Sequence, residues 1–327
     1  MSAIDVGTPA VDADLVCTVV DSLRSSDLIV PCGRMTEDDY FSLRHFFVHN
    51  YGGGAICWYS SYGAVSGCNF TNNTAKYNGG AITWNGANGT VSGCNFTNNT
   101  ANNYGGAIDW YCDNGAVSGC NFTNNTANHN GGAIYWNRDN GTVSGCNFTN
   151  NTANSNGGAI YWYGANGTVS GCTFINNAAN MGGGAISVQN ANLNVTKCAI
   201  VNNIAPTGSE IYIKGGNVNL NYNWWGSNNP NWANLINGSY ELSVFAVLNI
   251  TADPSEINAC EKSTITTKFV WNGTNTDVTN SLPKRNVKLT TNGTLTEIEG
   301  TVGLTSQFSV TTGGIYYVNG TVDNEIL

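Results

Sequence analysis

A cysteine recurs at a fixed interval of 26 residues through the middle of this 327-residue chain. Tryptophan, phenylalanine and asparagine repeat at the same interval. A period of this length indicates one structural unit per repeat, with each unit stacked on similar neighbours. The function therefore has to be sought on a repeating surface. The cysteine positions are Cys68, Cys94, Cys120, Cys146, Cys172 and Cys198.

Each repeat holds two short apolar runs that Asn/Gly clusters separate, as residues 79–104 illustrate. The runs favour Val, Ile, Thr, Trp and Phe, which form strands, and the clusters indicate turns. A leucine-rich horseshoe needs several leucines per repeat, whereas Leu193 is the sole leucine in residues 52–204. We therefore predict an all-β chain whose repeats form a right-handed parallel β-helix with 26-residue coils. Successive coils should be spaced by ~4.8 Å.

Alternation along the strands predicts which side chains point inward. The repeated Ile, Trp, Cys and Phe are expected inside, with Asn95 and Thr97 outside. The position after the isoleucine varies from coil to coil, which predicts a solvated row: Cys57, Thr83, Asp109, Tyr135, Tyr161 and Ser187. The phenylalanines of the interior ladder are Phe70, Phe96, Phe122, Phe148 and Phe174.

The stacked cysteines are interpreted as small buried hydrophobes, because free cysteine is often buried. Disulfides between coils and metal binding remain alternatives. The repeated asparagines are expected to bond the same residue one coil away and so to satisfy backbone groups at a turn. They are Asn73, Asn99, Asn125, Asn151, Asn177 and Asn203.

Composition shifts divide the chain into three parts. Residues 1–50 are expected to cap the solenoid, and Cys17 could pair there with Cys32 or remain free. The β-helix is assigned to residues 51–242. An Ig-like β-sandwich is assigned to residues 243–327, with strands near 248–252, 264–271, 287–291, 307–310 and 314–318. These segments alternate apolar and polar residues, as sandwich strands do.

Charge excludes several classes of partner. Only 10% of the residues are charged, and the repeats hold three acidic and three basic side chains. Such a surface does not attract nucleic acid by counterion release. No apolar stretch is long enough to span a membrane. His and Cys do not fall at zinc-ligand spacings, so neither a metal nor another cofactor is expected.

The repeats resemble those of known surface proteins. Gly79–Ile82 (Gly-Gly-Ala-Ile) with Phe96–Asn99 (Phe-x-x-Asn) is similar to the repeats of polymorphic membrane proteins. The fuller pattern, Ser-Gly-Cys-x-Phe-Thr-Asn-Asn-Thr-Ala, resembles adhesin-like proteins of methanogenic archaea. The motif Asn221–Gly226 resembles the segment that closes their β-helix before Ig-like modules. The resemblance implies secretion or display at the cell surface, although no ordinary export signal is evident, so a fragment of a longer protein is expected.

Two sets of residues are candidate sites. Exposed tyrosines with nearby asparagine amides suit sugar rings, which stack on aromatic faces and offer hydroxyls to amides. These candidates are Tyr59, Tyr111, Tyr135, Tyr161 and Tyr163. Asp113 and Asp139 occupy equivalent turns one coil apart, near Arg138, and form a weak candidate for calcium.

These candidates favour a non-catalytic adhesin-like protein that binds glycans or proteins of other cells. The rival interpretation is a polysaccharide lyase or hydrolase, because β-helices also house such enzymes and fold does not decide function. The threonine rows leave ice binding as a third option.

Overall fold

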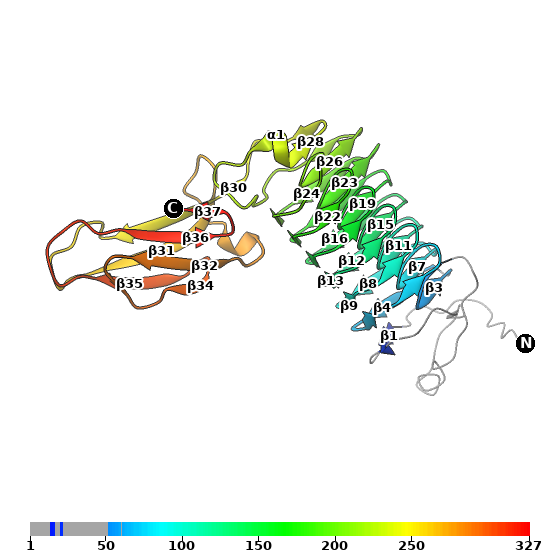
Figure 1. Ribbon diagram of the computed structural model, residues 1–327, viewed down its shortest axis with the longest axis horizontal. Helices are drawn as coiled ribbons and strands as arrows, with labels where there is room; N and C mark the ends of the chain where they lie inside the picture. Colours follow the sequence, from blue (N-terminus) through cyan, green and yellow to red (C-terminus); the bar gives the residue numbers. More distant parts are fainter. Residues whose placement is uncertain (1–13, 17–19, 22–51, 60) are drawn as a thin grey trace, which may run out of the picture.

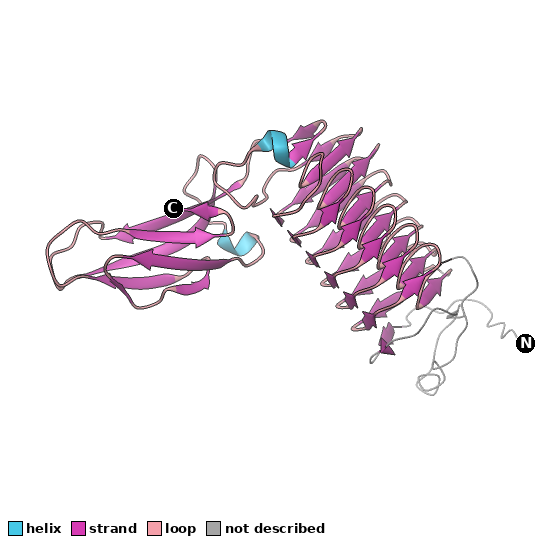
Figure 2. Cartoon of the chain, in the orientation of Figure 1, coloured by secondary structure: helices cyan, strands magenta, loops and turns pink. Residues whose placement is uncertain are grey.

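The computed structural model describes residues 14–16, 20–21, 52–59 and 61–327. The expected cap at residues 1–50, with the Cys17–Cys32 pair, lies outside the described residues except for two short strands. Figure 1 shows a long stack of strands followed by a separate β-structure that meets the stack at an angle. Figure 2 shows that nearly all regular structure of the described residues is strand.

Four parallel sheets run along the stack, and each coil contributes a strand to them in turn. We name each sheet after its repeated interior residue. The eight-stranded Trp sheet consists of β3 (Ile56–Trp58), β7 (Ile82–Trp84), β11 (Ile108–Trp110), β15 (Ile134–Trp136), β19 (Ile160–Trp162), β23 (Ile186–Gln189), β26 (Ile211–Lys214) and β28 (Ile236–Asn237).

The nine-stranded Val sheet consists of β1 (Asp14–Val16), β4 (Ala64–Ser66), β8 (Thr90–Ser92), β12 (Ala116–Ser118), β16 (Gly141–Ser144), β20 (Gly167–Ser170), β24 (Leu193–Thr196), β27 (Val218–Asn219) and β29 (Tyr240–Glu241). The seven-stranded Phe sheet consists of β2 (Val20–Asp21), β5 (Asn69–Thr71), β9 (Asn95–Thr97), β13 (Asn121–Thr123), β17 (Asn147–Thr149), β21 (Thr173–Ile175) and β25 (Ala199–Val201). The five-stranded Ala sheet consists of β6 (Thr74–Ala75), β10 (Thr100–Ala101), β14 (Thr126–Ala127), β18 (Thr152–Ala153) and β22 (Ala178–Ala179).

The register places each residue directly above its equivalent in the previous coil. Trp110 pairs with Trp136, and Phe122 pairs with Phe148. The stacked indole rings are 4.9 to 5.1 Å apart between centroids, and the phenyl rings are 4.8 Å apart. These distances equal the spacing of hydrogen-bonded strands. The structure therefore confirms a parallel β-helix with one coil per 26 residues.

The turns rely on left-handed backbone. Gly93 has a φ of 59° at the bend between the Val and Phe strands, and Asn98 has a φ of 56° at the next turn. Glycine and asparagine adopt this conformation more readily than other residues. The Asn/Gly clusters between the strands therefore supply the left-handed backbone that the turns of a narrow coil require.

The cysteine ladder lies in the interior. Its six members have no exposed surface, and they are thiols that form no disulfide with one another. Each thiol sits beside the next: the Cys94 amide approaches the Cys120 sulfur at 3.4 Å, and the Cys94 thiol donates to the Ser92 carbonyl at 3.3 Å. Burial holds the pKa of the Cys172 thiol well above its ordinary value. The prediction that these cysteines are core residues is confirmed.

The asparagine ladder carries hydrogen bonds in one direction. Asn99 donates its backbone N–H and its amide Nδ2 to the Asn125 oxygen, at 3.0 and 2.9 Å. The same pattern recurs from Asn73 to Asn177, which donates to Asn203. Glu210 ends it, accepting from Asn203 Nδ2 at 2.5 Å. A carboxylate fits this last place because it only accepts. The predicted structural role of the asparagines is confirmed.

The C-terminal part forms two antiparallel four-stranded sheets, as predicted for a sandwich. The first is ordered β30 (Ala246–Asp253), β31 (Lys262–Trp271), β35 (Thr305–Ser309) and β33 (Thr294–Leu295). The second is ordered β34 (Glu299–Thr301), β32 (Asn286–Thr291), β36 (Val318–Val322) and β37 (Glu325–Ile326). Two helical turns, α1 (Trp232–Leu235) and η2 (Thr279–Ser281), accompany the β-structure.

One predicted strand is wrong. Residues 314–317 form a loop, and the strand expected there begins only at Val318. The Asn292 side chain accepts the Tyr317 N–H at 2.9 Å, and the Tyr316 hydroxyl donates to the Thr312 carbonyl at 3.0 Å. These local hydrogen bonds replace the strand ladder there, as Asn side chains often do.

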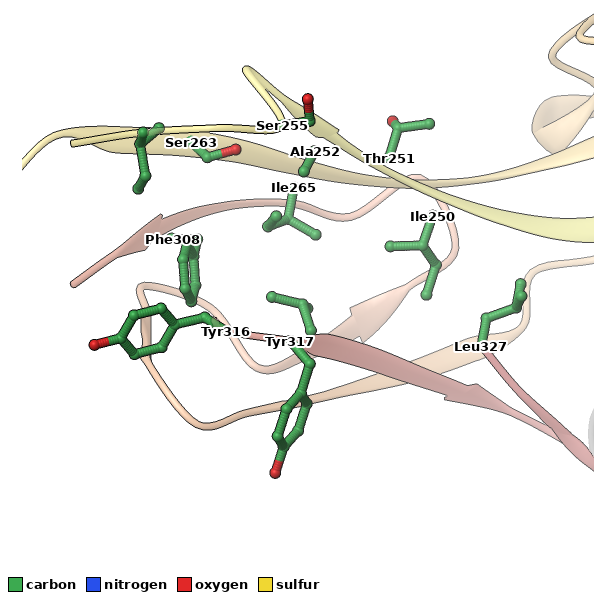
Figure 3. Close-up of a pocket in the computed structure, with 12 residues that line it drawn as sticks. Ile250, Thr251, Ala252, Ser255, Ser263, Ile265, Phe308, Tyr316, Tyr317 and Leu327 are labelled. Carbon is green, nitrogen blue, oxygen red and sulfur yellow. The ribbon is translucent and has the colours of Figure 1, made fainter. Parts of the chain in front are cut away.

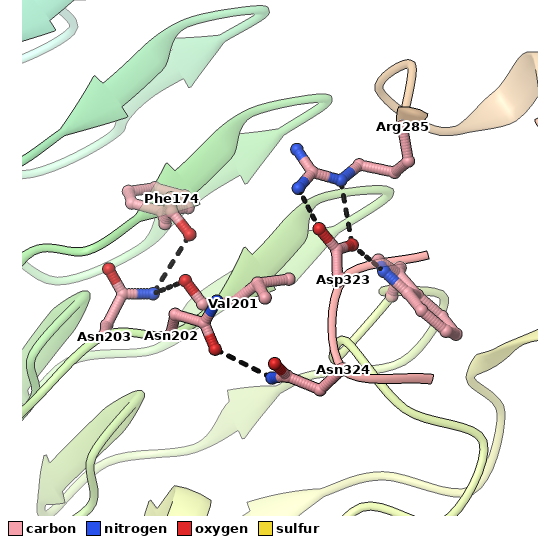
Figure 4. A network of polar contacts seen from close by, with 8 residues as sticks. Phe174, Val201, Asn202, Asn203, Arg285, Asp323 and Asn324 are labelled. Atoms are coloured by element: carbon pink, nitrogen blue, oxygen red, sulfur yellow. Dashed lines mark hydrogen bonds and ion pairs between the residues drawn. The ribbon is translucent and has the colours of Figure 1, made fainter. Parts of the chain in front are cut away.

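The solenoid and the sandwich share a core at their junction. Trp224 is fully buried and packs 4.8 Å from the Phe269 ring, between centroids. Its indole N–H donates to Asp323 Oδ2 at 2.7 Å, and Asp323 also pairs with Arg285 (Figure 4). Asn324 donates to Asn202 of the solenoid at 2.7 Å (Figure 4). The two parts are therefore held together by apolar packing and by the hydrogen bonds of Trp224 and Asn202, while the ion pair with Arg285 lies within the sandwich.

Replacing one interior asparagine should destabilise the fold. Asn125→Ala removes the acceptor for two Asn99 donors and the donor to the Phe96 carbonyl. Buried unpaired groups of this kind should lower the free energy of unfolding by about 3 kcal/mol. The matched control is Asn121→Ala, in the exposed asparagine row of the same coil, which should change it by less than ~0.5 kcal/mol. Urea unfolding followed by circular dichroism measures both, and equal effects would contradict the ladder.

Cysteine labelling tests the free-thiol core. Iodoacetamide should alkylate exposed Cys260 in the native chain and leave the six ladder cysteines unmodified until denaturant is added. Buried, protonated thiols react slowly because the thiolate is the nucleophile. Peptide mass mapping gives the result for each cysteine. Ladder cysteines that stay unmodified in denaturant without reductant would show disulfides instead.

Candidate functional site

The few charges of the solenoid are concentrated in two coils. Four of the six charged residues between positions 52 and 204 fall in residues 109–139: Asp109, Asp113, Arg138 and Asp139. A charge repeated in every coil would meet like-charge repulsion, so these charges are local departures from the repeat, and Asp113 and Asp139 are the one stacked pair among them. This region of the Trp sheet and its following turn is the candidate site.

The row that follows the isoleucines is covered, and the prediction that it is solvated is wrong. Thr83 is 5% exposed, Asp109 2% and Tyr161 6%, while Tyr135 is half-buried. The glycine-rich loop before each Trp strand folds over the row. Thr83 Oγ1 donates to the Asn78 carbonyl of that loop at 3.1 Å. The sequence pattern did not reveal this cover, because it comes from a turn rather than a strand.

Under this cover lies a tyrosine stack, comprising Tyr104, Tyr135 and Tyr161. Its ring centroids are 4.6 and 5.3 Å apart. The Tyr161 hydroxyl donates to the Gln189 side chain. Burial raises the pKa of Tyr161 to about 12. Of the five candidate tyrosines, Tyr135 and Tyr161 thus belong to a largely packed stack, and sequence reasoning missed its third member, Tyr104.

The other three candidates are exposed and occupy one position in alternate coils. Tyr59 is 60% exposed, and Tyr111 and Tyr163 are each 45% exposed. The coils between them carry half-buried Asn85 and Asn137 at this position. We call these five residues the Tyr/Asn row. It follows the end of each Trp strand, and backbone hydrogen bonds from coil to coil fix its spacing, such as Tyr111 N–H to the Trp84 carbonyl at 2.8 Å.

Neighbouring groups fix two of the exposed tyrosines. The guanidinium of Arg138 lies over the Tyr111 ring, 4.8 Å from its centroid. A hydrogen bond with the Cys57 thiol raises the pKa of Tyr59 to about 12. Arg138 forms no ion pair with the described residues, so its charge serves the aromatic contact, which is a favourable use of a guanidinium.

Asp109 is a buried carboxyl inside the covered row. Its Oδ1 has no hydrogen-bond partner among the described residues, and nor does the Oδ1 of Asn78. Burial raises the pKa of Asp109 to about 7, against the opposing effect of a hydrogen bond with the Asn78 side chain. A protonated carboxyl would supply a donor where two acceptors are otherwise unpaired. Sequence reasoning placed Asp109 in solvent, and only the covering loop explains its environment.

The two aspartates that were weak calcium candidates support turns. Asp113 Oδ1 accepts the Asp139 N–H at 3.1 Å, and Asp139 Oδ1 accepts the Ala165 N–H at 2.8 Å. One oxygen of each carboxylate is therefore engaged in linking successive coils. No group of three or more His, Cys, Asp or Glu that could hold a metal occurs within the described ranges.

The same two coils disturb the tryptophan ladder. Trp84 and Trp162 donate their indole N–H to the carbonyls of Gly86 and Gly164, both at 2.8 Å. Trp110 and Trp136 have no such partner in the described chain. Their equivalent turn positions hold non-glycine residues, Cys112 and Arg138. Within residues 108–139, two indole N–H groups therefore lack the hydrogen bond to a turn carbonyl that Trp84 and Trp162 make. Departures of this kind from local regularity are often found at functional sites.

The sandwich contains a pocket. It has a volume of about 270 Å³ and lies between residues of both sheets, including Ile250, Ile265, Phe308, Tyr317 and Leu327 (Figure 3). Its lining includes no charged side chain. Such a lining offers apolar contact together with the hydroxyls of serine, threonine and tyrosine.

The comparisons with known proteins identify the repeat. The family model of the Chlamydia polymorphic membrane protein repeat matches five segments, residues 67–83, 93–109, 119–135, 145–161 and 171–189. The repeats are thus similar to those of that family, as the Gly-Gly-Ala-Ile and Phe-x-x-Asn motifs predicted. No curated protein and no solved structure matches the chain. The likeness to methanogen adhesin-like proteins stays a prediction.

The first four matches end at Thr83, Asp109, Tyr135 and Tyr161, just before the Tyr/Asn row. They cover the phenylalanine and asparagine ladders and the glycine-rich loop. Tyr111, Arg138 and Tyr163 fall in the stretches between the matches. The features that distinguish this solenoid therefore lie outside the shared repeat pattern.

The buried Asp109 predicts a pH-dependent stability. Its folded pKa, about 7, lies above its unfolded value, so the folded state holds the proton more tightly. Stability should be highest below about pH 4, fall as the pH rises to about 7, and then level off. This burial should account for up to about 4 kcal/mol of the fall, at ~1.4 kcal/mol per pKa unit.

Asp109→Asn should therefore be more stable than the parent at pH 8, and the advantage should shrink towards pH 4. Urea unfolding at both pH values measures the difference. The control is Asp113→Asn, an exposed position in the following turn, which should change the free energy of unfolding by less than ~0.5 kcal/mol. An Asp109→Asn variant that is equally affected at both pH values would contradict the burial of a titrating carboxyl.

Proposed function

We propose that this chain is a non-catalytic, adhesin-like surface protein whose solenoid presents a repetitive face to glycans or proteins of other cells. The Tyr/Asn row carries the proposal, because it combines exposed aromatic rings with amides on a rigid scaffold. Aromatic faces and amides together suit sugar rings. The likeness of the repeats to those of a membrane protein family supports a location at the surface.

The low charge of the repeats supports an uncharged or weakly charged partner. The repeats carry few charges, and around the Tyr/Asn row Arg138 is balanced by the nearby Asp113 and Asp139. Nucleic acid is disfavoured for the same reason. No helix in the described ranges is long and apolar enough to cross a membrane.

The rival function is polysaccharide cleavage, which needs converging acid–base groups. No observation favours it specifically. Asp113 and Asp139 each commit an oxygen to a backbone N–H, and Asp109 lies beneath a loop. Catalysis would require carboxylates that face a substrate.

Binding to a glycan array and to intact cells tests the proposal with the soluble chain. We expect retention on at least one class of glycan or cell surface, and absence of binding to every surface would overturn the proposal. Incubation with pectins and related polymers, with and without calcium, tests the rival. We expect no chain cleavage; cleavage that Asp113→Ala or Asp139→Ala abolishes would establish the enzyme instead.

A further inference from the structure

The spacing of the exposed tyrosines is a specific geometric feature. Tyr59, Tyr111 and Tyr163 are 52 residues apart, which is two coils. The indoles that precede them are spaced by 5.0 and 5.1 Å over the first interval and by 4.9 Å twice over the second. Successive tyrosines therefore stand about 10 Å apart, two strand spacings, on one line along the solenoid.

This spacing matches the repeat of an extended glycan. In a β-1,4-linked chain with equatorial linkages, each sugar is turned over relative to the one before it. Alternate sugars therefore present the same face, at intervals of one disaccharide, which is close to the distance between the tyrosines. An aromatic ring at every second coil would meet the same sugar face each time, whereas a ring at every coil would not.

The positions between the tyrosines suit the intervening sugars. Asn85 and Asn137 are half-buried amides that can donate and accept hydrogen bonds with hydroxyls. The backbone of the row is fixed from coil to coil, since Asn85 N–H donates to the Trp58 carbonyl at 2.6 Å and Asn137 N–H to the Trp110 carbonyl at 2.9 Å. A backbone fixed in this way does not have to be ordered when a ligand binds, which favours affinity.

The charge of the surroundings selects among glycans. Arg138 covers one face of the Tyr111 ring, so a sugar at this position would pack against the uncovered side of the ring, and the nearby exposed carboxylates are Asp113 and Asp139. These three charges leave the row without the positive excess that an acidic polysaccharide would need. The charges around the Tyr/Asn row therefore favour an uncharged glycan as its ligand.

We propose that the Tyr/Asn row binds a neutral, extended β-1,4-linked glycan that lies along the solenoid axis, with alternate sugars on Tyr59, Tyr111 and Tyr163. This inference rests on the proposed function and deepens it, by naming the class of glycan and its orientation. Five consecutive sugars are needed to reach all three tyrosines.

Calorimetric titration with defined oligosaccharides tests the proposal. Cellohexaose and chitohexaose should bind the intact chain more tightly than cellobiose, because the dimer reaches one tyrosine only. Maltohexaose, an α-1,4-linked helical chain, and hexagalacturonate, an acidic chain, should bind weakly or not at all. Equal binding of maltohexaose and cellohexaose would overturn the proposal.

Variants test the role of the row. Tyr111→Ala should weaken cellohexaose binding about three- to tenfold, the usual worth of one aromatic contact. The matched control is Tyr77→Ala, which removes a 39%-exposed tyrosine outside the row and should leave the affinity unchanged. Circular dichroism confirms that each variant is folded.

A positional exchange separates spacing from composition. The double variant Asn85→Tyr with Tyr111→Asn keeps three tyrosines in the row but breaks the two-coil interval. It should lose at least as much affinity as Tyr111→Ala, and affinity equal to the parent's would overturn the spacing argument. If the hexasaccharides fail while the array shows other glycans bound, this inference falls and the proposed function stands. If nothing binds in either assay, both fall.

Discussion

Hydrogen bonding of each coil to the next, in strict register, is the constraint on which the rest of the structure depends. It places most interior side chains of the repeats against a copy of themselves, as the indole and phenyl stacks show. A residue type can fill such a column only if its side chain packs or hydrogen-bonds favourably against an identical side chain. Flat rings and small thiols do so by packing, and asparagine does so because its amide donates to one neighbour and accepts from the other. Glu210 can occupy only the end of the asparagine column.

The same constraint explains at which positions the residue type can differ from coil to coil. Charged side chains do not form long columns; apart from the stacked pair Asp113 and Asp139, those of residues 52–204 occur singly, at the outer surface or under a loop. Asp109, Asp113, Arg138 and Asp139 gather in two adjoining coils, where two indole N–H groups also lose their usual carbonyl partners. The exposed tyrosines alternate with asparagine instead of forming a continuous stack like Tyr104, Tyr135 and Tyr161. On this scaffold, the residues that differ from the repeat are therefore the ones that can form a specific binding surface.

Sequence periodicity was sufficient to predict the coil length, the inward columns and the free cysteines, because each depends only on register. It failed for the row that follows the isoleucines. Alternation assigns Tyr161 and Asp109 to the outer face, but it carries no information about a turn that folds back over that face. The strand predicted at residues 314–318 failed for a related reason, since the Asn292 side chain captured a backbone N–H of that segment. For the candidate site, the sequence predicted which tyrosines recur along the solenoid. It did not predict which of them are exposed, because that depends on how the turns pack over the strands.

Near-ultraviolet circular dichroism during thermal unfolding of a coil-deletion variant tests the central claim most directly. Removing residues 125–150 excises one full period and joins Asn124 to Asn151, so every column should close again in register. The account predicts a retained signal from the stacked indoles and a single cooperative transition. A control that removes only residues 125–137, half a period, should lose both. Loss of the signal and of the transition in the full-period deletion as well would contradict the account.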